Sequence, residues 1–265
     1  MRGVILDVLY RVLFDAAERK PDTEVIDRPD WIQLRTPSSP LVQHNKVLRA
    51  VIAERDAERV VAEVLADHAE RGAALVWHVD GVSQPRDFSA RLLAAGLPRL
   101  GEGLGMYRDT GIADDGLPAS VRIEEAGLSH VEVFTNLVCR AWPRPRSFAA
   151  EVGAWVRKSI EQPELGSVHF VAYCDDEPVG TASLLMFPNE LAYMRGAAVL
   201  PAYRGRGIYT ALMRRRLAHC AANGRDTAVI WANPDTSAPV ARQLGFIEVA
   251  GAHVTFHDSY AGEDA

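Results

Sequence analysis

The sequence has few of the features that mark secreted, membrane-spanning or zinc-binding proteins. Its three cysteines, Cys139, Cys174 and Cys220, are far apart and form no Cys-x-x-Cys pair. This spacing argues against a disulfide framework or a structural zinc, so we expect buried thiols in a reducing compartment and no metal site. No apolar stretch approaches the length that spans a bilayer. Asp7 and Arg11 interrupt the apolar N-terminus, which predicts an amphipathic helix and not a signal peptide.

Positive charge is also in deficit. The 265 residues include 29 Lys and Arg against 35 Asp and Glu, which gives a formal net charge of −6. A nucleic-acid-binding protein would usually show a basic balance or a long basic stripe. With 48% apolar residues the composition is that of a globular protein. We therefore expect a cytoplasmic protein that binds neither nucleic acid nor a membrane, and whose oligomeric state the sequence does not indicate.

Two αβ halves flank a segment rich in turn-forming residues at 109–119. The first half predicts helices at 4–19, 54–71 and 88–95 and strands at 46–52 and 73–79. The second half predicts strands at 120–124, 168–174, 179–187, 191–200, 227–232 and 246–256. Its helices are expected at 129–142, 147–160, 208–223 and 237–244. We predict domains at 1–112 and 119–258 and a tail at 259–265, each domain being an α/β (α+β) unit.

The most informative segment joins a strand to a long helix through two glycines. After the apolar run that ends at Pro201 come Arg204-Gly205-Arg206-Gly207, and a helix begins at once. Glycines allow positive φ and a close approach to the backbone. The helix N-terminus adds unsatisfied N–H groups and the positive end of a dipole. Together with the two arginines, this pattern predicts a cradle for a pyrophosphate.

This segment resembles the signature of the GNAT superfamily of acyl-CoA-dependent N-acyltransferases, an Arg/Gln-x-x-Gly-x-Gly/Ala loop. Arg204 and Gly207 match it, while Tyr209 departs from the small residue usual in last place. The resemblance covers about 121–256. It implies two GNAT-like domains, each a mixed, mostly antiparallel sheet flanked by helices, the N-terminal one being degenerate and without the cofactor loop.

The resemblance further implies direct transfer of an acyl group, by default acetyl, from coenzyme A to an amine. Val199 corresponds to the position whose backbone holds the pantetheine arm and stabilises the oxyanion. The implied cofactor-binding residues are Ala198, Val199, Arg204, Gly205, Arg206, Gly207, Ile208, Tyr209, Thr210 and Asn233. An Asn-Pro turn is the structural alternative for Asn233. Arg214, Arg215 and Arg216 are expected on a solvated helix face, with contact to the 3′-phosphate as the alternative.

The catalytic acid and base are less well defined. In many family members a tyrosine that protonates the leaving thiolate stands where this chain has Ala241. In some members a glutamate stands where this chain has Tyr193. We predict that Tyr193 relays a proton or lines the acceptor pocket. Glu124, Glu125 and Glu190 are the other carboxylates considered, all more typical of solvated surface.

The acceptor is expected to be the amine of a small molecule or a protein. A non-catalytic acyl-CoA-binding sensor or interaction module is the alternative function, because the usual acid and base are both missing.

Overall fold

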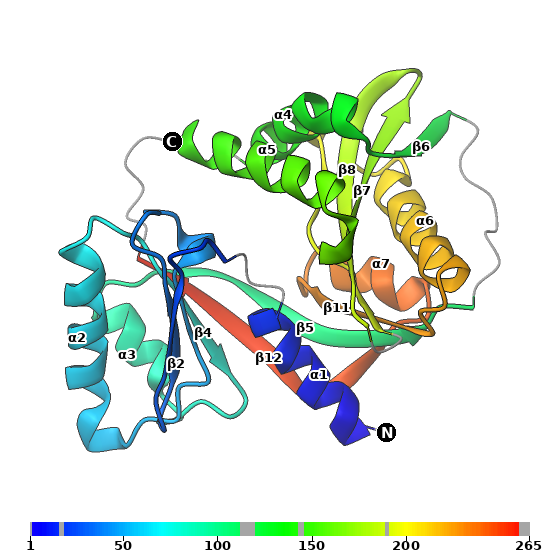
Figure 1. Cartoon of the computed structure of the whole chain (residues 1–265). Coiled ribbons are helices and arrows are strands. Elements are labelled where there is room, and N and C mark those ends of the chain that lie inside the picture. The colour runs from blue at the N-terminus through cyan, green and yellow to red at the C-terminus, as the bar shows by residue number, and fades with distance from the viewer. Residues whose placement is uncertain (1, 16–18, 112–119, 143–145, 189–190, 260–265) are drawn as a thin grey trace. The chain divides into compact units, whose positions relative to one another are not determined.

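The computed structural model describes the chain except for residues 1, 16–18, 112–119, 143–145, 189–190 and 260–265. It forms two compact units (Figure 1). Unit 1 comprises Met1–Met106, Trp231–Pro239 and Glu248–Asp264, and unit 2 comprises Tyr107–Ile230 and Val240–Ile247. The division by contacts thus places the C-terminal strand in unit 1, whereas the sequence analysis ends the second domain with it. The boundaries at 112 and 119 remain a prediction, and most of the expected linker lies outside the described residues.

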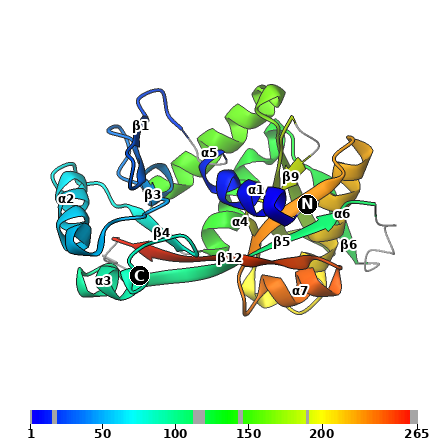
Figure 2. The ribbon, with the colours of Figure 1, turned by 90° about the horizontal axis from the view of Figure 1, so that it is seen from below.

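Unit 1 contains a sheet in the order β1-β2-β3-β4-β12-β5. The strands are β1 (Glu24–Asp27), β2 (Ile32–Arg35), β3 (Lys46–Leu48), β4 (Val76–Asp80), β5 (Arg99–Asp109) and β12 (Ile247–Asp258). The strands β3 and β4 pair in parallel, and β12 runs antiparallel along β4 (Figure 2). The sequence analysis did not predict β1, β2 or β5.

The helices of unit 1 cover both faces of its sheet. They are α1 (Arg2–Asp15), α2 (Ala57–Ala69) and α3 (Phe88–Ala94), with 3-10 turns at Val42–His44 and Glu54–Asp56. Apolar side chains of α2 and α3 pack around the fully buried Trp77. On the opposite face, Leu13 and Phe14 of α1 pack against Leu34 and Leu48.

Unit 2 contains a sheet in the order β11-β9-β8-β7-β6, and β10 pairs with β8. The strands are β6 (Val121–Glu125), β7 (Ser167–Cys174), β8 (Glu177–Met186), β9 (Leu191–Tyr193), β10 (Ala197–Val199) and β11 (Thr227–Ala232). The predicted hairpin turn is confirmed, since Asp175 and Asp176 adopt φ of 51° and 64° between β7 and β8. The pairing of β11 with β9 is parallel and the other registers in this unit are antiparallel.

Helices flank the sheet of unit 2 on both faces (Figure 1). They are α4 (Val131–Ala141), α5 (Arg146–Glu161), α6 (Ile208–Ala222) and α7 (Ser237–Gln243), with 3-10 turns at Leu128–His130, Pro163–Leu165 and Pro201–Tyr203. Phe134 of α4 and Trp155 of α5 contact His169 of β7 edge-on, whereas the next residue, Phe170, contacts His219 of α6. Because successive side chains of a strand point to opposite faces, α4 and α5 cover one face and α6 the other. The predicted α/β class, with mostly antiparallel sheets flanked by helices, is confirmed.

Candidate functional site

The glycine turn of unit 2 has the backbone geometry that the sequence predicts. Gly205 and Gly207 adopt φ of 75° and 77°, a left-handed conformation that side chains disfavour. Residues 204–207 are exposed, and a Cβ added at Gly205 would meet no heavy atom within 4 Å. The turn therefore presents its main chain to open space, so that a phosphate can approach it closely.

The end of α6 next to this turn is open and lacks negative charge. Gly207 is the N-cap residue, no side chain caps the end, and the first turn contains no acidic residue. The N–H groups of Ile208, Tyr209 and Thr210 precede the first helical hydrogen bond, which runs from Ala211 N to Gly207 O (2.9 Å). Together with the exposed guanidinium groups of the turn, these amides form a group of hydrogen-bond donors and positive charge of the kind that binds phosphate.

The two arginines of the turn are held by neighbouring residues. The Arg206 guanidinium lies over the ring of Tyr203, 5.0 Å from its centroid. Arg204 Nε donates to Val199 O at 3.2 Å. The second contact ties the turn to the preceding strand, β10.

A β-bulge separates β9 from β10, where the sequence predicts one strand at 191–200. Leu185 pairs with Tyr193 and Ala182 with Ala197, so one extra residue lies on the β9–β10 side. Ser183 N donates to both Arg195 O (3.1 Å) and Gly196 O (2.9 Å). Such an insertion bends the strand and ends its regular pairing.

The bulge frees the edge of β10 that faces away from β8. The pairing of β11 with β9 ends at Val229 and Tyr193, and the described part of β10 pairs with β8 alone. Leu200 N donates to Val179 O (2.9 Å), so by antiparallel alternation the N–H and C=O of Val199 point away from β8. The contact of Val199 O with Arg204 agrees with this direction. The Val199 amide thus lies on an unpaired edge and is available to an incoming carbonyl.

Tyr193 lies on β9 just before the bulge. Its side chain is partly buried, and desolvation raises the pKa of its phenol above the ordinary value of 10.0. The nearby positive charges of Arg195 and Arg216 counteract this shift only in part. The phenol is therefore protonated at neutral pH and can donate a hydrogen bond, but it is a poor general base.

Asn233 follows β11, and its side chain holds the turn that precedes α7. Its Oδ1 accepts hydrogen bonds from Asp235 N, Thr236 N and Thr236 Oγ1, each at 3.0 Å. This is the Asn-Pro turn that the sequence analysis names as the structural alternative. The contact of Asn233 with a cofactor remains a prediction.

The position at which the family usually carries its acid is buried in this chain. Ala241 lies on α7 with no exposed surface. Glu124 and Glu125 are on β6, where Glu124 accepts from Arg122 and His130 and Glu125 lies 3.5 Å from His219. Glu190 lies outside the described residues.

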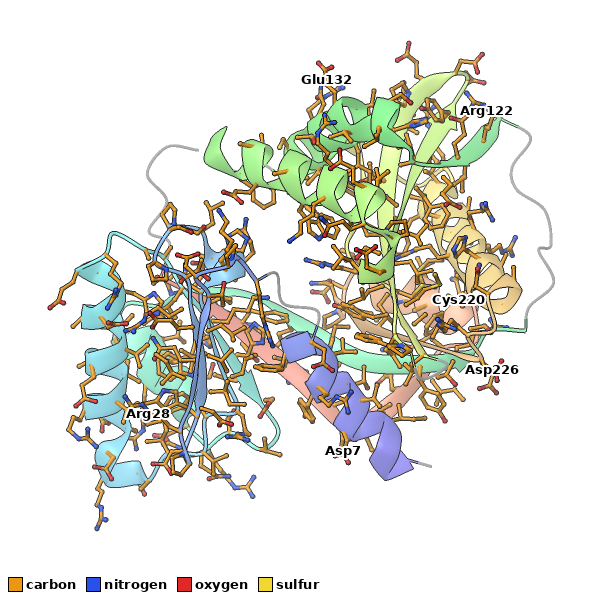
Figure 3. All side chains as sticks on the ribbon, in the orientation of Figure 1. Asp7, Arg28, Arg122, Glu132, Cys220 and Asp226 are labelled. Atoms are coloured by element: carbon orange, nitrogen blue, oxygen red, sulfur yellow. The ribbon has the colours of Figure 1, made fainter. Side chains whose placement is uncertain are left out.

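Arg216 is buried, which corrects the expectation that it lies on a solvated face. Its side chain is 1% exposed, whereas Arg214 and Arg215 are partly exposed. Cys220, labelled in Figure 3, follows one turn later on the same buried side of α6, and burial raises the pKa of its thiol to about 12. The sequence contained a signal for this burial, since Arg216 is four residues from both Leu212 and Cys220.

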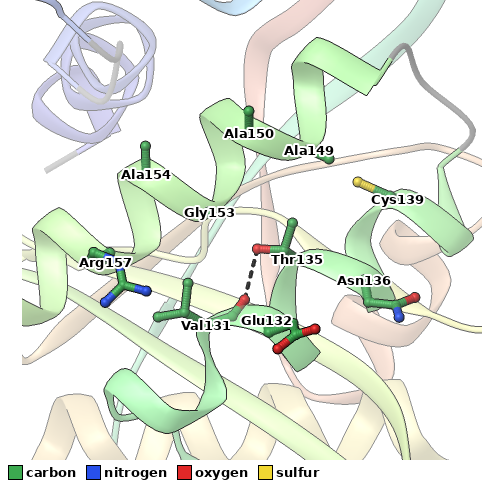
Figure 4. Close-up of a pocket in the computed structure, with 10 residues that line it drawn as sticks. All are labelled: Val131, Glu132, Thr135, Asn136, Cys139, Ala149, Ala150, Gly153, Ala154 and Arg157. Atoms are coloured by element: carbon green, nitrogen blue, oxygen red, sulfur yellow. Dashed lines mark hydrogen bonds between the residues drawn. The ribbon is translucent and has the colours of Figure 1, made fainter.

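A separate cavity of about 500 Å³ lies between α4 and α5 (Figure 4). Small residues of α5, among them Gly153, face Thr135 and Cys139 of α4 across it. None of its lining residues belongs to the glycine turn or to β10. The turn and the edge of β10 are open surface features and are distinct from this cavity.

The described parts of the chain contain no helix long and apolar enough to cross a membrane. Across these same residues, no three His, Cys, Asp or Glu side chains come together as a set that could bind a metal.

The match to a protein-family model lies in the C-terminal half of the chain. Residues 132–246 match the model of the acetyltransferase (GNAT) family. The chain is 46% identical over 79 residues to mycothiol acetyltransferase from Nocardia farcinica. This similarity covers 29% of the chain and only 25% of that relative.

Solved structures resemble the chain over nearly its whole length. A GCN5-related N-acetyltransferase from Kribbella flavida matches with a TM-score of 0.67 at 13% identity, over 99% of this chain and 96% of its own. A conserved protein of unknown function from Staphylococcus epidermidis gives 0.69 at 14% identity, over 90% and 94%. A tandem GNAT protein from the clavulanic acid biosynthesis pathway gives 0.56 at 16% identity, over 100% and 96%. At these identities the likeness establishes the fold alone.

Proposed function

We propose that this chain, whose residues 132–246 match the model of the acetyltransferase (GNAT) family, transfers an acyl group, by default acetyl, from coenzyme A to a primary amine. The observation that carries the proposal is the combination of the exposed glycine turn at an uncapped helix N-terminus with the unpaired Val199 amide. The first fits a diphosphate and the second fits a thioester carbonyl, which are the two ends of one acyl-CoA molecule.

In the proposed reaction the neutral amine attacks the thioester carbonyl directly. The N–H of Val199 donates to the oxygen on which negative charge develops. Collapse of the tetrahedral adduct breaks the carbon–sulfur bond, the amine nitrogen loses a proton, and the sulfur leaves with the electron pair and is protonated. Acetyl-CoA and amine thus yield amide and free coenzyme A thiol.

Tyr193 is proposed to act in its protonated form. Since burial raises the pKa of its phenol, it serves as a hydrogen-bond donor or as part of a water relay. The ammonium form of the acceptor would lose its proton to water before the attack, because a free amine has a pKa of about 10 and is mostly protonated at neutral pH.

The acceptor is proposed to be the amine of a small molecule. The similarity to mycothiol acetyltransferase, a small-molecule enzyme by its name, favours this class over a protein amine, although it spans only a quarter of that relative. We also propose a cytoplasmic location, where acetyl-CoA is available.

The test is release of thiol from acetyl-CoA across a panel of primary amines, with mass spectrometry of the product. An increase in acceptor mass by one acetyl group, at a rate above that of the protein-free control, is expected. Background thiol release with every amine, together with calorimetric binding of acetyl-CoA, would instead support an acyl-CoA-binding sensor. The fully buried Ala241 at the position of the usual acid is the observation that favours this second candidate.

A further inference from the structure

The bulge between β9 and β10 leaves a carbonyl that the sheet itself does not satisfy. Arg195 N–H donates to Tyr193 O (2.9 Å) and so does not reach across to β8. Ser183 O on β8 receives its hydrogen bond from Arg216 Nη1 (3.1 Å), which also lies 3.4 Å from Arg195 O. A buried carbonyl without a donor is costly, so this guanidinium stabilises the irregular backbone of the bulge.

The same side chain is fixed along α6. Arg216 Nε donates to Leu212 O (3.3 Å) and Nη2 to Met213 Sδ (2.9 Å). It is 1% exposed, and its partners among the described residues are carbonyls, a thioether and a hydroxyl, with no carboxylate among them. Arg216 therefore gains little from ion pairing with these residues. What it contributes is a set of several N–H donors in a fixed geometry.

The remaining partner of Arg216 lies beside the glycine turn. The Tyr209 hydroxyl, in the first turn of α6, lies close enough to the guanidinium to interact with it. Tyr209 is also the residue that departs from the small side chain usual at this place in the family signature. One buried side chain therefore contacts both the helix end that fits the diphosphate and the bulge that exposes the Val199 amide.

A second connection holds the bulge from the opposite face of the sheet. Ser183, whose N–H binds the two bulge carbonyls, has its Oγ 2.9 Å from His169 Nδ1. His169 Nε2 lies 2.7 Å from Ser159 Oγ on α5. The bulge is thus fixed from both faces, by Arg216 of α6 on one side and by His169 of β7 with Ser159 of α5 on the other.

We propose that Arg216 is a positioning residue for acyl transfer, which sets the Val199 amide relative to the glycine turn by clamping the β9–β10 bulge to α6. The inference rests on the proposed function, since it assigns the residue to the same acyl-CoA site. Removal of the clamp disturbs the thioester end of the site and leaves the diphosphate cradle intact, because the cradle is made of main-chain groups at the start of α6.

The test compares two ligands in the full-length protein. Acetyl-CoA probes both ends of the site, and 3′-phosphoadenosine 5′-diphosphate probes the nucleotide end alone. Arg216→Met removes the donors at similar volume, and Lys158→Met removes an exposed positive charge on α5 of the same unit as the control. For Arg216→Met we expect a Kd for acetyl-CoA raised about tenfold, a Kd for the nucleotide within about twofold of wild type, and a reduced kcat.

The outcomes separate this inference from the proposed function. If Arg216→Met binds both ligands and turns over within about twofold of wild type, or loses both ligands equally while folded, the positioning role is wrong. If the wild type binds neither ligand, the proposed function itself fails. Should Arg216→Met not fold, Arg216→Lys decides by the same comparison, because one ammonium group cannot reproduce the spread of guanidinium donors and a selective loss for acetyl-CoA of at least about threefold is expected.

Discussion

Gly205 and Gly207 show how much of this site depends on backbone conformation. Both adopt φ near +75°, and the main chain between them is exposed at the start of α6. A side chain in this conformation costs about 1–2 kcal/mol, and at Gly205 it would also occupy the space in front of the amides. Here the sequence prediction agrees with the structure, because glycine spacing is a local signal.

Arg216 is the residue that the sequence analysis placed wrongly. Three consecutive arginines look alike in a sequence, and polar runs on helices are usually solvated. Each helical residue is rotated by about 100° from the one before, however, so Arg214 and Arg215 can remain at the surface while Arg216 faces the sheet. The carbonyls that accept its hydrogen bonds lie at the β9–β10 bulge and on β8, and no local sequence pattern predicts that arrangement.

The state of Tyr193 gives a prediction about pH. Its raised pKa keeps the phenol protonated below pH 9, so its ionisation does not shape the rate profile in that range. Tyr193→Phe is expected to lower kcat roughly tenfold or more through loss of the hydroxyl donor, with the Kd for acetyl-CoA within about twofold of wild type. The measurement is kcat/KM from pH 6 to 9 for both proteins.

The matched control for this variant is Tyr173→Phe on β7, whose ring lies under the Arg122 guanidinium. The Tyr173→Phe variant keeps the aromatic ring under the Arg122 guanidinium and should leave kcat unchanged. A limb of the wild-type profile below pH 9 that vanishes in Tyr193→Phe would show that Tyr193 acts as an ionised base, against this account.

At the scale of elements, regular helices and hairpins were predictable and irregular strands were not. The boundaries of β11 and the start of α6 agree with the sequence analysis, because apolar periodicity and glycine mark them. The bulge within 191–200 was missed, since one extra residue leaves the apolar pattern almost unchanged. The strand β5 was missed because Gly101, Gly103 and Gly105 remove the side chains from one of its faces.

The glycines of β5 give a prediction for unit 1. A Cβ at Gly105 would lie 2.5 Å from the Cβ of Ala252 and 2.8 Å from Leu9 Cδ1, whereas a Cβ at Gly101 would meet nothing within 4 Å. Gly105→Ala is therefore expected to lower the free energy of unfolding by about 1–3 kcal/mol through overpacking. Chemical denaturation with Gly101→Ala as the control measures the difference.

The control substitution on the same strand should be neutral or stabilising by up to about 1 kcal/mol, because it has room and restricts the unfolded chain. Equal losses of unfolding free energy in the two variants would mean that β5 needs glycine for its backbone conformation. Close packing would then not explain the glycines of this strand.

At the scale of the whole molecule, the two units differ in their capacity to bind a phosphate. The helix α2 of unit 1 is preceded by Glu54 and Asp56 and has Glu58 in its first turn, whereas the start of α6 in unit 2 has no acidic residue. Negative charge at a helix N-terminus repels an anion. Each chain should therefore contain one acyl-CoA site, in unit 2.

The most direct measurement is calorimetric titration of the full-length protein with acetyl-CoA, in the wild type, Gly205→Glu and Gly224→Glu. Gly224 ends the same helix, has φ of 64° and is equally open, so it matches the strain and the charge of the first substitution. We expect one site per chain in the wild type and in Gly224→Glu, and no detectable binding in Gly205→Glu with its circular dichroism unchanged. Retention of wild-type affinity by Gly205→Glu would contradict the claim that the amides at the start of α6 bind the diphosphate.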